Sequence, residues 1–174
     1  MKLNMNMNEV HHTVKKIYEE NELRNLSDFH SVSKKDIMQK VSRYFQIDLY
    51  LTDRLDSNES NNLGNQYRIF ISSNKPFNDQ WQDFAFFIGC ILLDKYHDSG
   101  TSESLTNSMD TARIFSFEFC APYFLIKELQ EMQKEYIDNY SKVLVLMNVF
   151  DINYYFATKR LTFLRYQKFK EQSS

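Results

Sequence analysis

The chain has 174 residues, and a chain of this length is usually one domain that buries its own core. Hydrophobic residues make up 43% and aromatic residues 16%, whereas glycine and proline number only 3 and 2, which favours helices over a turn-rich β-sandwich. A formal net charge of −2 excludes a general electrostatic attraction to nucleic acid or acidic lipid.

The first third of the chain predicts two helices joined by a polar segment. Apolar residues at helical spacing predict a first helix over about 9–23. His11 and His12 lie side by side on it, and adjacent helical residues point about 100° apart, so we expect two solvated histidines. Residues 25–33 are polar and predict a linker, after which Ser33 should cap a helix over 34–45.

Two short segments have the composition of strands. Apolar and polar residues alternate over 47–52, and residues 67–72 are rich in strand-forming side chains. The polar run between them, 53–66, predicts a solvated loop with Gly64 as its turn residue. Helices followed by a strand pair and then only helices predict the α+β class: a mostly helical protein whose small sheet is built from this pair.

The remainder predicts helices separated by one polar loop. A helix contains Trp81–Leu93, and residues 97–108 predict a loop. Further helices are expected over 109–121, 123–136 and 140–150, and a last one, capped by Asp151 or Asn153, runs to about residue 170. We expect a single domain over 1–174.

Cysteine usage and the absence of long apolar runs indicate the compartment. Cys90 and Cys120 lie in apolar runs, which predicts two reduced, buried thiols rather than a disulfide or a metal pair. No apolar run approaches the roughly 20 residues that span a bilayer, and the first residues lack the apolar core of a signal peptide. We expect a cytoplasmic protein.

The helix WQDFAFFIGCILL has a glycine, Gly89, in its interior. Over about 33–164, the order of elements resembles the ImmA/IrrE family of zinc metallopeptidases. The residues Ala85–Cys90 stand where that family has Ala-His-Glu-Leu-Gly-His. The other matching pieces are Ile69–Ser72 before this helix, Ala112–Pro122 with its Ala, Phe and Pro spacing, Phe150–Asn153, and Arg160-Leu161.

The functional positions of the family are occupied by other residue types. The resemblance puts the two zinc-binding histidines at Phe86 and Cys90, the general base at Phe87 and the third ligand at Met109. Zinc needs three protein ligands and an open position; phenyl rings supply none, one thiolate is too few, and Asp110 is one residue out of register. We therefore expect a pseudoenzyme without zinc or another cofactor, in which Phe86 and Cys90 face the same interior.

The resemblance also implies a class of partner. Members of this family are often encoded by phages and integrative elements and act on helix-turn-helix repressors, which implies an antirepressor that binds such a transcriptional repressor. One alternative is an active hydrolase with atypical ligands or a Cys90 nucleophile. Another is an unrelated α+β protein in which Gly89 only lets two core helices approach closely.

The last predicted helix offers a second candidate surface. Basic and aromatic side chains alternate along it, and the candidate partner-binding residues are Arg160, Arg165, Tyr166 and Lys168. Such a pattern can bind a nucleic-acid strand, dock an acidic partner through aromatic anchors, or form a solvated basic face. We expect a protein partner rather than nucleic acid.

Overall fold

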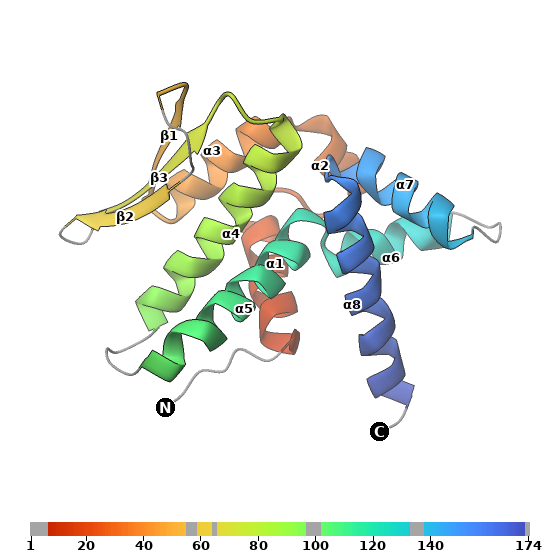
Figure 1. Cartoon of the computed structure of the whole chain (residues 1–174). Helices are drawn as coiled ribbons and strands as arrows, with labels where there is room; N and C mark the ends of the chain where they lie inside the picture. The colour runs from red at the N-terminus through yellow and green to blue at the C-terminus, as the bar shows by residue number, and fades with distance from the viewer. Residues whose placement is uncertain (1–6, 55–58, 64–65, 97–101, 133–137, 173–174) are drawn as a thin grey trace.

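The computed structural model describes residues 7–54, 59–63, 66–96, 102–132 and 138–172. It is mostly helical, with a small three-stranded sheet at one edge of the molecule, which confirms the predicted α+β class (Figure 1). In chain order the elements are α1 (Met7–Glu20), α2 (Leu26–Ser31), α3 (Lys34–Tyr44), β1 (Asp48–Thr52), β2 (Glu59–Leu63), β3 (Gln66–Ser72), α4 (Phe77–Tyr96), α5 (Ser102–Cys120), α6 (Tyr123–Met132), α7 (Asn139–Phe150) and α8 (Tyr154–Gln172).

The two predicted strands are neighbours in the sheet. Its order is β1-β3-β2, with β1 parallel and β2 antiparallel to β3. Ile69 and Ile71 of β3 are fully buried, because side chains alternate between the two faces and theirs pack into the core. On the other face, the rings of Tyr50 and Phe70 stack with their centroids 4.9 Å apart.

The loop predicted over 53–66 is wrong in its second half, where β2 forms. The residues ESNNL have one apolar side chain and no alternation, so the sequence lacks the usual strand signal. They pair with the free edge of β3, whose backbone groups form the ladder whatever the side chains are. Gly64, the predicted turn residue, lies outside the described residues.

Two helical segments were also predicted as loop. The linker predicted over 25–33 contains α2, a helix of 6 residues. Asn25 caps it, and its side chains Leu26 and Phe29 are buried. The loop predicted over 97–108 already contains the start of α5 at Ser102, because extending a formed helix costs little. The N-caps predicted at Ser33 and, for the last helix, at Asn153 are confirmed.

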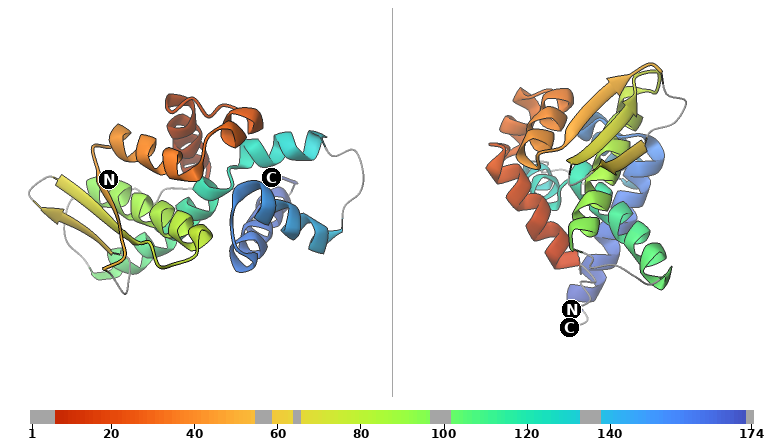
Figure 2. Two further views of the ribbon diagram at one scale, coloured as in Figure 1. Left: turned by 90° about the horizontal axis from the view of Figure 1, so that it is seen from above. Right: turned by 90° about the vertical axis from the view of Figure 1, so that its left-hand side faces the viewer.

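The core lies between the antiparallel pair α4–α5 and the helices around it (Figures 1 and 2). Trp81, Phe84 and Phe119 form its aromatic centre, with Trp81 and Phe119 ring centroids 5.3 Å apart. The Tyr18 hydroxyl of α1 donates to the Phe119 carbonyl over 2.6 Å. The sheet and the α7–α8 pair lie at opposite ends of the molecule (Figure 2, left). Among the described helices, none is long and apolar enough to cross a membrane.

Candidate functional site

Gly89 lies at a close approach of α4 and α5. A Cβ atom placed there would lie 3.0 Å from the Ala112 carbonyl oxygen and 3.1 Å from the Ala112 Cα. These are backbone atoms, which cannot rotate away. Gly89 therefore lets the two helix backbones pack closely, as expected for the core-helix alternative, and this role is compatible with the family resemblance as well.

The three residues of α4 that the resemblance places at motif positions are only half-buried. Phe86, Phe87 and Cys90 are each partly exposed, while Ala85 and Ile88 are fully buried. The rings of Phe86 and Phe87 meet edge to face with centroids 5.8 Å apart, and Phe87 packs against the core. Phe86 and Cys90 were expected to face the interior together, and each is only partly buried. We call the partly exposed apolar surface made of Phe86, Phe87 and Cys90 the α4 face.

The fourth position lies on α5 and is open to solvent. Met109 is 44% exposed. Its neighbour Asp110 is exposed as well, and its carboxylate lies 3.9 Å from the Arg113 guanidinium, one helical turn away. Neither side chain is buried among other potential ligands.

These residues do not fit a zinc ion. Phenyl rings carry no donor atoms, and zinc sites take thiolate, imidazole or carboxylate ligands. In the described part of the chain, no group of three or more His, Cys, Asp or Glu residues is placed to hold a metal. Burial raises the pKa of the Cys90 thiol to about 11, so at neutral pH it stays protonated and is a poor nucleophile.

A buried ionic network links the four helices α1, α5, α6 and α8. The Glu118 carboxylate of α5, 1% exposed, forms an ion pair with Arg160 of α8 and accepts the Tyr123 backbone N–H over 2.7 Å. His11 of α1 places its Nδ1 atom 2.8 Å from the same carboxylate. The Arg160 Nε atom also donates to the Ala121 carbonyl over 2.8 Å.

Electrostatics in this network favour an ionised Glu118. Burial alone would raise the pKa of this carboxyl group, but the Arg160 charge, the His11 contact and the Tyr123 N–H together lower it. The prediction of a solvated His11 is wrong, because the ring is mostly covered and lies 5.3 Å from the Tyr123 ring. His12 is exposed, as predicted.

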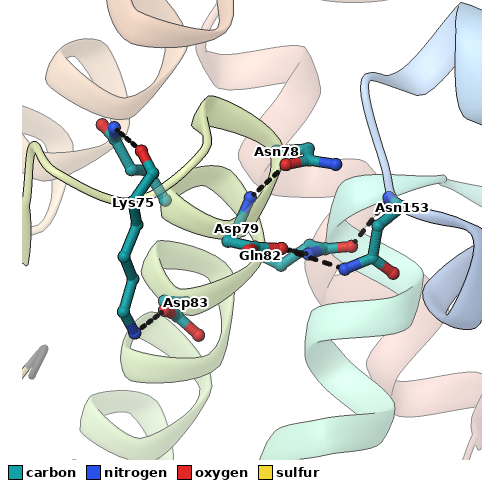
Figure 3. Close-up of polar contacts among 7 residues, drawn as sticks. Lys75, Asn78, Asp79, Gln82, Asp83 and Asn153 are labelled. Atoms are coloured by element: carbon teal, nitrogen blue, oxygen red, sulfur yellow. Dashed lines mark hydrogen bonds and ion pairs between the residues drawn. The ribbon is translucent and has the colours of Figure 1, made fainter.

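A second polar cluster joins the first turns of α4 and α8 (Figure 3). The Asp79 carboxylate accepts from the side-chain amides of Gln82, over 3.2 Å, and Asn153, over 3.0 Å. The Asn153 backbone N–H donates to the Gln82 carbonyl oxygen over 3.1 Å. Nearby, the Lys75 ammonium lies 3.1 Å from Asp83. The two contacts of Asn153 fix the start of α8 against α4.

The structure separates the four candidate residues of the last helix. Arg160 is fully buried in the ionic network, so it does not belong to an exposed surface as predicted. The sequence gives one hint of this burial: Glu118 is the only acidic residue in the apolar run IFSFEFC, and a buried acid is usually paired with a base. The hint does not say which basic residue is the partner. Arg165 is exposed. The side chains of Tyr166 and Lys168 lie outside the described residues.

Comparisons with known proteins give one family and one fold. A family model described as the IrrE N-terminal-like domain matches residues 30–162. A solved structure of a Mycobacterium tuberculosis transcriptional regulator is similar with a TM-score of 0.67 and 14% sequence identity. The match covers 91% of this chain and 48% of that one, so this chain spans about half its length. No curated protein matches the chain in sequence.

Proposed function

The chain belongs to the IrrE N-terminal-like domain family, and we propose that it is a non-catalytic member that regulates transcription by binding another protein. The partner is a helix-turn-helix repressor, and the chain acts as an antirepressor of the kind carried by phages or other mobile elements. Binding blocks the repressor without cutting it. The expected catalytic positions are assigned from this family membership.

The observation that carries this proposal is the residue type at the four expected catalytic positions. Phe86, Phe87 and Met109 supply neither a zinc ligand nor a general base, and the raised pKa of Cys90 keeps its thiol protonated. A hydrolase of this family needs three ligands and a base at once. The loss of all of them on a recognisable scaffold favours binding over catalysis.

The α4 face supports a contact role by its chemistry. Aromatic side chains that remain partly exposed are typical anchors of protein interfaces, since they bury a large area with few rotatable bonds. Phe86 is not among the side chains that pack against the core, whereas its neighbour Phe87 is. We therefore place the repressor contact on Phe86 and its surroundings.

The proposed role in transcription agrees with the name of one similar protein. The similar solved structure is named a transcriptional regulator. That likeness shows a shared fold, and the step from fold to regulation in this chain is part of the proposal. The candidate partner to test is a helix-turn-helix repressor encoded by the gene next to this one.

The test is a titration of that repressor on its operator DNA. We expect release of the operator in proportion to the amount of this protein, with the repressor intact on a gel afterwards and with no effect of chelators. Phe86→Ser should weaken this release, and Leu144→Ser, an exposed apolar position on α7, is the matched control. Repressor fragments at substoichiometric amounts of this protein would reject the binding model in favour of a hydrolase.

The hydrolase alternative with a Cys90 nucleophile is tested in the same assay. Cys90→Ser removes the only thiol of the α4 face and preserves the shape of the side chain. If the chain acts by binding, this variant should release the operator as well as the parent does. A complete loss of activity in a folded Cys90→Ser protein would support the nucleophile instead.

A further inference from the structure

Positive charge is concentrated in the last two helices. Residues 139–174 contain six of the 21 Lys and Arg residues and two of the 23 Asp and Glu residues, which leaves this segment with +4. Because the whole chain carries −2, residues 1–138 carry −6. Arg160 forms an ion pair with Glu118, and Asp151 lies 3.4 Å from the Lys34 ammonium.

One side of α8 presents Lys159 and Arg165 to solvent together with tyrosine side chains. The inner side is buried and consists of Phe156, Ala157, Arg160, Leu161 and Leu164. The α8 outer face consists of the exposed residues Tyr154, Tyr155, Lys159, Thr162 and Arg165. Tyr155, Lys159 and Thr162 follow the i, i+4, i+7 spacing and so form a single stripe. Tyr155 is 66% exposed, with the Lys159 ammonium 5.5 Å from its ring centroid.

α8, which carries this face, is fixed by contacts with α4 and α5. Asn153 caps it by accepting the Phe156 N–H over 2.9 Å and ties it to α4 through Asp79. Phe117 of α5 contacts Phe156 and Phe163, with ring centroids 4.5 and 5.3 Å apart. A partner that binds here meets side chains on a fixed backbone, which lowers the entropy lost on association.

We propose that the α8 outer face binds an acidic segment of a protein partner. Tyr154 and Tyr155 serve as the apolar anchors, and Lys159 and Arg165 lie opposite carboxylates of the partner. The face belongs to a different helix from the α4 face, so this contact stands or falls independently of the repressor contact proposed there.

The charge distribution favours an acidic protein segment over nucleic acid. Proteins that bind DNA contact several phosphates, and the α8 outer face has only two cations among its described side chains. The net charge of −6 on residues 1–138 repels a long polyanion. A short acidic segment, by contrast, need contact only the positively charged residues 139–174. Exposed tyrosine next to basic residues is also typical of protein interfaces.

The test is fluorescence anisotropy of the full chain with a labelled peptide of Glu-Glu-Leu repeats at low salt. A Gln-Gln-Leu peptide and a single-stranded oligonucleotide are the comparison ligands. We expect binding of the acidic peptide, weakened about fivefold by Lys159→Glu and about tenfold by Tyr155→Ala. Lys16→Glu, at an exposed position on α1, is the matched control and should change the affinity by less than about twofold.

Three results would overturn the proposal. One is equal binding of the acidic and the neutral peptide. Another is an equal effect of Lys159→Glu and Lys16→Glu, since the attraction would then depend on net charge alone. The third is tighter binding of the oligonucleotide, with the same dependence on Tyr155 and Lys159, which would assign this face to nucleic acid. Because the assay contains no repressor, none of these results bears on the α4 face.

Discussion

At the scale of single residues, the missing side chain of Gly89 determines how closely α4 and α5 pack. We expect Gly89→Ala to lower the free energy of unfolding by about 1–2 kcal/mol, because overpacking against the Ala112 backbone outweighs the gain in helix propensity of about 1 kcal/mol. Urea denaturation measures the change. Asn148→Ala, at an exposed position on α7, should be neutral or slightly stabilising. A Gly89→Ala protein as stable as the parent would contradict the close contact.

Glu118 is the residue whose charge matters most to the core. Glu118→Gln keeps the shape of the side chain and removes the charge that compensates the buried Arg160. We expect a loss of about 3–5 kcal/mol in the free energy of unfolding at neutral pH, the usual result when one partner of a buried ion pair is removed. Glu131→Gln, on the exposed end of α6, is the control and should have little effect.

The same pair predicts a pH dependence with a definite sign. Because the pKa of Glu118 is lowered in the folded state, its contribution is complete above the ordinary glutamate pKa of about 4.3. It is lost as the pH falls through the lowered folded-state value. The stability difference between the parent and Glu118→Gln should therefore be largest near neutrality and shrink below about pH 4. A difference that stays constant down to acid unfolding would mean that Glu118 is not ionised.

At the scale of elements, the polar cluster between α4 and α8 combines a helix cap with an interhelix link. Asn153→Ala removes the cap on Phe156 N–H and the bond to Asp79. We expect it to destabilise the protein by about 1–2 kcal/mol, and by more than Ser33→Ala, which removes only contacts within the exposed first turn of α3. A double-mutant cycle with Asp79→Ala separates the two contributions. Equal effects of Asn153→Ala and Ser33→Ala would show that the link contributes nothing.

The long helices and the apolar strands could be predicted from the sequence, and the short or polar elements could not. α1 and α3 have apolar residues at helical spacing, whereas α4 and the helices after it were found as long runs rich in apolar residues. By contrast, α2 has only Leu26 and Phe29 to bury, and β2 has a polar sequence that pairs because β3 offers an open edge. Such short elements form through tertiary contacts, which local sequence does not encode.

The same limit applied to the candidate site. The α4 positions followed from the family resemblance, because they lie within one helix. The Glu118 network did not, because its partners His11 and Arg160 lie far away in sequence on α1 and α8. Arg160 therefore looked like one more cation on a basic helix, and only the three-dimensional contact separates it from the exposed Arg165.

At the scale of the whole molecule, the proposed absence of catalysis predicts that the protein binds no zinc and that its stability does not depend on metal. Purified protein should contain no stoichiometric zinc by elemental analysis, and chelator should shift its thermal midpoint by less than about 1 °C, since only a metal bound to the folded state stabilises it. Phe86→His with Cys90→His and Phe87→Glu should not restore peptidase activity, because Met109 still supplies no third ligand. About one zinc per chain after dialysis would contradict the pseudoenzyme.

The hydroxyl of Tyr18, bonded to the Phe119 carbonyl 101 residues further along the chain, has a consequence during synthesis. At translation rates of about 5–20 residues per second, α1 leaves the ribosome about 5–20 s before the helix that covers it. Its apolar side chains Val10, Val14 and Ile17 stay uncovered for that time. The N-terminal helix is then a natural target for chaperones, and a stalled nascent chain that ends before α5 should be far more sensitive to protease than the finished protein.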